Sequence, residues 1–185
     1  MPHSLSRRQN ILIMMLDDVG FADFGCYGSE IETPVIDALA ERGVRYTGFH
    51  TTAMCSTTRA SLHTGRNHHS VGMGCLANFD SGYPGYRGKI DADAPTIAEV
   101  LRPAGFRNYF IGKWHVTPLT QSGPTGPFDG WPLGRGFDRF YGFLAPRPIS
   151  TRRSWFGTTA TSSRQATTRL GITSPQTCST RRSRW

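Results

Sequence analysis

The stretch Asn10-Ile-Leu-Ile-Met-Met-Leu16, followed at once by Asp17-Asp18, decides the predicted fold of this 185-residue chain. The run is continuously apolar rather than alternating, which is typical of a strand that is covered on both faces of a parallel sheet. The two carboxylates would then lie at the carboxyl end of a strand, where open α/β sheets bind their ligands. A hard divalent cation could hold such a pair, and a solvated acidic turn is the simpler interpretation of the pair alone.

Helix and strand signals alternate along the residues that follow. Proline near the start and glycine at the end mark the first helix, and the helix over 94–101 again starts beside a proline. Residues 117–142 are rich in Gly and Pro, so long loops are predicted there. The fold class is therefore α/β, with a mixed or mostly parallel sheet flanked by helices. The predicted elements are strands over 10–16, 44–50 and 107–112, and helices over 34–42, 57–63 and 94–101, the last with Ile97, Val100 and Leu101 facing inward.

Residues 145–185 differ in composition from the rest of the chain. They contain eight Arg and no acid, whereas residues 1–144 contain 13 Lys+Arg and 13 Asp+Glu, so the tail carries the entire net charge of +8. Ser, Thr and Arg make up 24 of its 41 residues, which leaves too little apolar area to offset the ordering entropy. We predict a disordered basic tail that binds polyanions, or alternatively the product of a frameshift near Leu144.

Targeting and cysteine signals are weak. The longest apolar run, Ile11 to Leu16, is far shorter than the ~18 residues that span a bilayer, and it is too short to complete an export signal after Arg7-Arg8. We therefore expect a cytoplasmic protein with no membrane partner.

The four cysteines form no CxxC pair, which argues against a zinc ribbon and a disulfide scaffold; they are Cys26, Cys55, Cys75 and Cys178.

The stretch Cys55-Ser-Thr-Thr-Arg-Ala-Ser-Leu-His-Thr-Gly-Arg66 places a cysteine at the start of a predicted helix, with Arg59 one turn along. The helix dipole and the free amides of a first turn favour a negative or polarised group there. Residue types alone leave two interpretations of Cys55, a small buried hydrophobe or a thiol of low pKa, and they favour the first.

The Cys-x-x-x-Arg-Ala-x-Leu-x-Thr-Gly-Arg pattern, taken with Leu16-Asp17-Asp18 and Gly112-Lys-Trp-His115, resembles the type I sulfatase family, and its arylsulfatase branch most. The resemblance covers residues 10–144, including residues 134–142. It implies an alkaline-phosphatase-like α/β fold, here incomplete. It also divides the chain into a leader over 1–9, a partial catalytic domain over 10–144 and the tail over 145–185.

The resemblance also implies a site and its partners. Cys55 would be oxidised to formylglycine by the formylglycine-generating enzyme, and one calcium ion would be bound by Asp17, Asp18 and the modified Cys55. Arg59 would orient the formylglycine, and Lys113 and His115 would contact the sulfate and the nucleophile. The expected substrate is a small sulfate ester, and no specific nucleic acid is expected as a partner.

The chemistry of this assembly has a physical rationale. A thiolate that attacked a sulfate ester would form a dead-end product, whereas a hydrated aldehyde carries two hydroxyls on one carbon, one to attack sulfur and one to expel sulfate. Arg59 and Lys113 would add positive charge where negative charge concentrates. In an extended segment Lys113 and His115 point to the same side, so both could reach one ligand, and His115 could take a proton.

Two features limit the predicted activity. Thr57 stands where the family most often has Pro or Ala, and the family's second set of calcium and sulfate ligands lies in a later stretch that this chain lacks. The oxygen donors therefore fall below the 6 to 8 that calcium prefers. We expect a weakly active or inactive hydrolase, with a phosphate or phosphonate monoester hydrolase and a non-enzymatic, polyanion-binding product as alternatives.

The remaining histidines have plainer interpretations. His68 and His69 could ligate a metal, but neighbouring histidines on a polar loop are more often solvated. His50 and His63 are predicted to pack or to lie on a helix surface.

Overall fold

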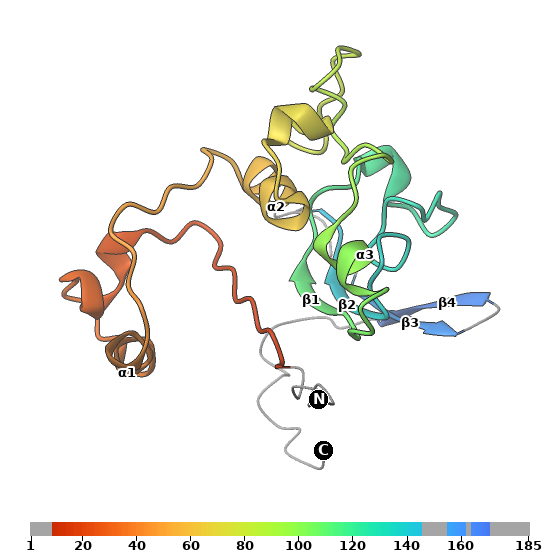
Figure 1. Ribbon diagram of the computed structural model, residues 1–185. Coiled ribbons are helices and arrows are strands. Elements are labelled where there is room, and N and C mark those ends of the chain that lie inside the picture. Colours follow the sequence, from red (N-terminus) through yellow and green to blue (C-terminus); the bar gives the residue numbers. More distant parts are fainter. Residues whose placement is uncertain (1–8, 146–154, 162–163, 171–185) are drawn as a thin grey trace, which may run out of the picture. The chain divides into compact units, whose positions relative to one another are not determined.

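The computed structural model describes residues 9–145, together with the backbone of two strands at 155–161 and 164–170 (Figure 1). The chain divides into two compact units, Met1–His50 and Thr51–Trp185. The second unit contains the parallel strands and the buried core, and the first contains one α-helix and two short 3-10 helices.

The first unit is organised around helix α1 (Pro34–Arg42), which begins and ends as predicted, after Thr33 and before Gly43. Two 3-10 helices precede it, η1 (Phe21–Asp23) and η2 (Gly25–Tyr27). Asp37 in the first turn of α1 accepts hydrogen bonds from the Cys26 amide at 2.7 Å and from the Thr33 hydroxyl at 2.9 Å. These contacts hold α1 against η2, although no residue between 9 and 50 is buried.

The strands predicted over residues 10–16 and 44–50 are wrong, because neither stretch is a strand in the structure. The parallel βαβ unit that they would form with α1 is absent from residues 9–50. A strand is stable only when a partner satisfies its backbone groups, and both stretches lack one among the described residues. Their apolar side chains are exposed instead, with Leu12 at 85% and Val44 at 80%.

The second unit carries a four-stranded sheet in the order β1-β2-β3-β4. Strands β1 and β2 are parallel, with Tyr109 opposite Arg139 and Lys113 opposite Phe143, and the other pairs are antiparallel. Gly142 permits the close approach of β1 and β2, since a Cβ atom there would overlap the carbonyl oxygen of Gly112. The strands are β1 (Tyr109–Lys113), β2 (Arg139–Phe143), β3 (Trp155–Thr161) and β4 (Arg164–Leu170).

Two α-helices and two 3-10 helices complete the second unit. They are α2 (Cys55–Thr64), η3 (His68–Val71), α3 (Ile97–Leu101) and η4 (Leu119–Gln121). Figure 1 shows α2 and α3 beside β1 and β2. The strand predicted over 107–112 is confirmed as β1, which begins two residues later and ends one residue later than predicted. The helix predicted over 57–63 is confirmed as α2.

The core of this unit is aromatic. Trp114 is completely buried, and its ring lies 5.1 Å from that of Phe110 and 5.8 Å from that of Phe137, both at steep edge-to-face angles. Phe140 of β2 is also buried and neighbours Phe110. Edge-to-face pairs of this kind contribute beyond the area they bury, so β1, β2 and the segment after β1 are fixed by one cluster.

Three further expectations differ from the structure. The helix predicted over 94–101 starts only at Ile97, because Thr96 caps it, and Val100 points outward with 60% exposure. Strand β2 lies inside the predicted loop region 117–142. The tail over 145–185 is predicted to be disordered, whereas the structure describes two strands in it, β3 and β4. Residues 146–154, 162–163 and 171–185 of the tail, and residues 1–8 of the leader, lie outside the described residues.

No helix among the described residues is long and apolar enough to cross a membrane.

Candidate active site

Helix α2 places Cys55 at its first position. Met54 precedes it in extended conformation, and Gly65 ends it in left-handed conformation with φ of 65°, where a residue without Cβ is favoured. Cys55 is half-buried, and its side chain projects from the turn whose amides have no partner within the helix. The sequence prediction that Cys55 lies at a helix N-terminus is confirmed.

His115 contacts Cys55, which lies 60 residues earlier in the sequence. Its Nδ1 lies 3.1 Å from the Cys55 Sγ, and the imidazole residue is only 4% exposed. The His115 amide donates to the Leu144 carbonyl at 2.6 Å, and the residue has a left-handed backbone with φ of 56°. A non-glycine residue in this region is strained by ~1 kcal/mol, so the surrounding contacts hold the imidazole against the thiol.

Arg59 links the same helix to the end of β1. Its guanidinium donates to the Lys113 carbonyl at 2.6 Å, and the residue is 6% exposed. Lys113 is the last residue of β1 and is half-buried. Four residues singled out from the sequence, Cys55, Arg59, Lys113 and His115, are therefore joined by two direct contacts between α2 and the 113–115 segment.

The geometry differs from expectation in one respect. The prediction that Lys113 and His115 point to one side assumes an extended segment, and the positive φ of His115 ends that extension. Both residues nevertheless contact helix α2. The Lys113 carbonyl binds Arg59, and the His115 imidazole lies against Cys55.

Asp17 and Asp18 belong to the first unit and are exposed. Asp18 has a φ of 58°. Of the residues that the structure describes, Asp18 and His115 are the two non-glycine residues with positive φ, and both are predicted site residues. Asp and His are among the non-glycine residues that adopt this conformation most often.

The donor set for a metal is incomplete in the described part of the chain. No group of three or more His, Cys, Asp or Glu side chains there could hold a metal ion. Asp17 and Asp18 supply carboxylates from adjacent positions, whereas calcium takes 6 to 8 oxygen ligands. The described residues therefore do not fit a complete calcium site.

His63 is buried beneath the candidate site. Its ring lies 4.7 Å from Trp114 and 5.6 Å from Phe110, and it is 6% exposed. Burial, followed by the charges of Arg59 and Arg135, lowers the pKa of His63 from 6.5 to about 4. A neutral imidazole therefore packs in the core at neutral pH, which confirms the packing interpretation.

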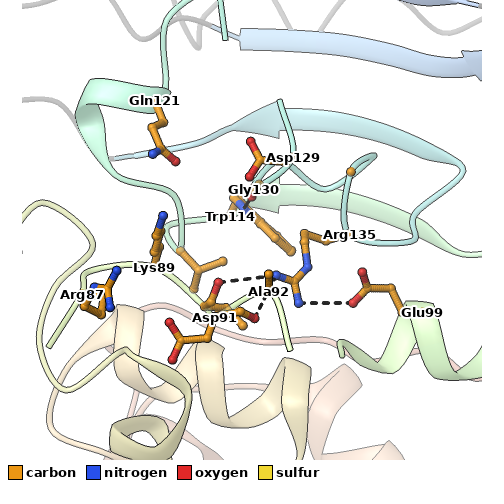
Figure 2. A pocket seen from close by; sticks show the side chains of 13 residues that line it. Arg87, Lys89, Asp91, Ala92, Glu99, Trp114, Gln121, Asp129, Gly130 and Arg135 are labelled. Atoms are coloured by element: carbon orange, nitrogen blue, oxygen red, sulfur yellow. Dashed lines mark hydrogen bonds and ion pairs between the residues drawn. The ribbon is translucent and has the colours of Figure 1, made fainter. Parts of the chain in front are cut away.

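The sequence analysis missed Arg135. This residue is 6% exposed, and its guanidinium donates to the Ala94 carbonyl at 2.5 Å and pairs with Glu99 at 3.2 Å. It borders a cavity of about 430 Å³ whose lining includes Trp114 and Lys89 (Figure 2). A buried arginine leaves no periodic signal in the sequence, and the family resemblance over residues 134–142 did not distinguish Arg135 from its neighbours.

His68 and His69 make protein contacts. The Nδ1 of His68 lies 3.0 Å from the Met73 carbonyl oxygen, and that of His69 lies 3.3 Å from Asn67 Oδ1. Their ring centroids lie 4.1 Å apart, with the ring planes tilted by 38°, on a partly exposed 3-10 helix. Among the described residues, His68 and His69 belong to no group of three or more side chains that could hold a metal ion. Cys26 and Cys75 are free thiols, as is Cys55.

The comparisons with known proteins agree on one family. The family model described as Sulfatase matches residues 9–171. The chain belongs to the sulfatase family. This sulfatase chain is 38% identical to an uncharacterized sulfatase of Schizosaccharomyces pombe over 146 residues, or 75% of the chain and 25% of that protein. It is 33% identical to the arylsulfatase of Klebsiella aerogenes over 139 residues, or 74% of the chain and 28% of the relative.

Human arylsulfatase A is 38% identical over 143 residues, or 75% of this chain and 26% of the relative. Among solved structures, Ps i-CgsB in complex with k-i-k-neocarrahexaose is similar, with a TM-score of 0.53 and 31% identity over 70% of this chain and 27% of that chain. The sulfatase chain thus spans about a quarter of the length of these relatives. The expected α/β, alkaline-phosphatase-like fold class, in incomplete form, is confirmed.

Proposed function

We propose that this sulfatase chain carries part of an arylsulfatase-type active site, in which Cys55 is the precursor of a formylglycine that cleaves sulfate monoesters. Membership of the sulfatase family supports a sulfuric ester hydrolase. The contact of 3.1 Å between Cys55 Sγ and His115 Nδ1 carries the residue assignment. It joins the one motif cysteine to a buried base across 60 residues of sequence.

Each residue of the cluster has a role that follows from its contacts. The Nδ1 of His115 lies 3.1 Å from the Cys55 Sγ. His115 can therefore hold or remove the proton of the group that the Cβ of residue 55 carries, which is the thiol before conversion and a hydroxyl of the hydrate afterwards. Arg59 binds the end of β1 through the Lys113 carbonyl, so it fixes the distance between helix and strand. The positive charges of Arg59 and Lys113 attract the sulfate, and they stabilise the negative charge that grows on its oxygens during cleavage.

The formylglycine would supply the hydrated aldehyde whose two hydroxyls on one carbon allow attack and release. Formation of this group on Cys55 requires the formylglycine-generating enzyme as a partner. Asp17 and Asp18 would contribute carboxylate oxygens to a calcium ion. Since the described donors fall short of a calcium site, no step of the reaction is assigned to the ion, and this chain by itself should hydrolyse sulfate esters only slowly.

The proposal is tested by producing the chain together with a formylglycine-generating enzyme and measuring release of nitrophenol from nitrophenyl sulfate and nitrophenyl phosphate. We expect slow hydrolysis of the sulfate ester that is lost in Cys55→Ala and in His115→Ala. Cys26→Ala is the matched control, because Cys26 is a half-buried free thiol in the first unit. Sulfate hydrolysis that survives in Cys55→Ala, or a preference for the phosphate ester, would contradict the proposal.

A further inference from the structure

Three consecutive hydroxyl residues follow Cys55 and tie the first turn of α2 to other parts of the unit. The Ser56 hydroxyl accepts a hydrogen bond from the Ala77 amide at 3.2 Å, and both groups are buried. Thr57 and Thr58 bind in another direction, toward the segment that enters the helix. Cys55 therefore lies where two sets of side-chain contacts meet.

Thr52 is the centre of the second set. Its Oγ1 lies 2.5 Å from Thr57 Oγ1, 2.6 Å from Thr58 Oγ1 and 3.2 Å from the Met54 carbonyl oxygen. The Thr57 hydroxyl also donates to the Met54 carbonyl at 2.8 Å, and the Thr58 hydroxyl donates to the Thr52 carbonyl at 3.1 Å. We call Thr52, Thr57 and Thr58 the threonine clamp. It fixes the backbone on the N-terminal side of Cys55.

The clamp lies at a helix start that has no side-chain cap. Met54 occupies the position before α2 and has no side-chain oxygen, so no side chain there caps the first amides. Thr57 lies in the first turn, is completely buried and uses its hydroxyl to hold the Met54 carbonyl from inside the helix. The family most often has Pro or Ala at this position, and neither has a hydroxyl. The clamp therefore depends on the Thr57 of this chain.

We propose that Thr52 and Thr57 are positioning residues that hold Cys55 within contact distance of His115. Cys55 has a single rotatable bond between its backbone and its sulfur, so once the clamp fixes the backbone only a few staggered positions remain for Sγ. His115 is held by a separate contact, the hydrogen bond that its backbone amide donates to the Leu144 carbonyl. Small misplacements of reacting groups, of the order of 1 Å, are costly in catalysis, so a loosened first turn would separate the pair.

The alternative is that Thr57 only fills space in the core. Its complete burial is compatible with that role, and Val would serve it equally well because Val has the same shape. Thr57→Val and Thr57→Ser separate the two roles, since the first keeps the volume and loses the hydroxyl, and the second keeps the hydroxyl and loses a methyl. Thr52→Val and Thr52→Ser repeat the comparison from the half-exposed side of the clamp.

The experiment measures the ¹⁵N chemical shift of His115 Nδ1, which senses a hydrogen bond to Sγ directly, in the full chain with unmodified Cys55. Cys55→Ala defines the shift in the absence of the contact. We expect Thr57→Val and Thr52→Val to move the shift more than half of the way toward the Cys55→Ala value, and both Ser variants to stay near the wild type. The ring signals of His63 report whether the core is intact and should not move.

Wild-type shifts in both Val variants, with an intact core, would overturn the positioning role. So would equal changes in the Val and Ser variants, because these would indicate packing rather than hydrogen bonding. The catalytic consequence rests on the proposed function and is measured separately: in the converted chain, Thr57→Val should lower kcat for nitrophenyl sulfate with little change in KM. If the wild type hydrolyses no sulfate ester, the proposed function fails while the NMR comparison still decides the clamp.

Discussion

Residues 9–50 and residues 51–145 of this sulfatase chain both contain apolar segments, but apolar side chains are buried only in the second region. In the first region no side chain is buried, and Leu12 is 85% exposed. In the second, Trp114 is completely buried and Phe140 is 2% exposed. The difference is that β1 has β2 as a partner in register, whereas residues 10–16 have no strand partner among the described residues. Apolar composition makes a core only where the backbone groups are also paired.

The largest expected difference between the regions is in amide hydrogen exchange. Among the described residues, no amide from 10 to 16 donates to another backbone group, whereas the amides of α2 and β1 lie in regular structure. Amides of α2 and β1 should exchange at least about a thousandfold more slowly than those of residues 10–16. Mass spectrometry of peptides from the two regions measures this, and equal protection would show that residues 10–16 are paired in solution.

Truncating one apolar side chain in each region gives the next largest effect. Trp114→Ala should lower the free energy of unfolding by about 3–5 kcal/mol, because it removes the ring that contacts His63, Phe110 and Phe137. Leu12→Ala should change it by less than about 0.5 kcal/mol, since the side chain is exposed. Urea unfolding followed by Trp fluorescence, with the buried Trp131 among the reporters that remain, measures both. Similar losses in the two variants would contradict the contrast.

Acid should destabilise the second region through His63. Its pKa is about 4 in the folded chain and near 6.5 when exposed, so the unfolded state binds the proton first as the pH falls. The contribution of His63 to stability is complete above pH 6.5, is lost between pH 6.5 and 4, and amounts to about 3 kcal/mol. Urea unfolding at a series of pH values measures the loss.

A matched pair of variants assigns this pH dependence. His63→Leu should remove it, whereas His50→Leu, at an exposed position in the first region, should leave it unchanged. An unaltered pH profile in His63→Leu would mean that other groups cause the acid sensitivity.

The smallest expected effect compares two helix starts. Thr96 caps α3 by accepting from the Glu99 amide at 3.2 Å, and its hydroxyl donates to the buried Arg135 carbonyl at 2.8 Å. Thr33, before α1, makes its contacts at half-exposed positions and caps no amide of its own helix. Thr96→Ala should cost about 1–2 kcal/mol and Thr33→Ala less. Thermal or urea unfolding ranks the two, and the reverse order would show that burial does not set the cost.

The sequence predicted those elements whose signals are local. Helix α1 follows from Pro34 and Gly43, and α2 follows from the stop signal at Thr64-Gly65. The strands over 10–16 and 44–50 failed because a strand depends on a partner that no local pattern specifies. Strand β2 was missed among Gly and Pro residues, although its aromatic residues Phe140, Tyr141 and Phe143 favour a strand and could have indicated it.

The site was predicted through the family pattern rather than through residue types. Residue types alone favoured a small buried hydrophobe at Cys55, and only the resemblance joined it to His115, 60 residues away. The role of Thr52 was beyond reach, because its contacts depend on how the chain bends before α2. The strained φ values of Asp18 and His115 are likewise properties of the folded backbone.

The most direct test of the account is the chemical state of residue 55 after the chain is produced together with a formylglycine-generating enzyme. Peptide mass spectrometry with a hydrazine-based aldehyde label should find a labelled peptide containing residue 55 of lower residue mass than cysteine, and no labelled peptide from the Cys55→Ala chain. A peptide that carries only the free thiol, under conditions in which the enzyme converts a control sulfatase, would contradict the assignment of Cys55 as the nucleophile precursor.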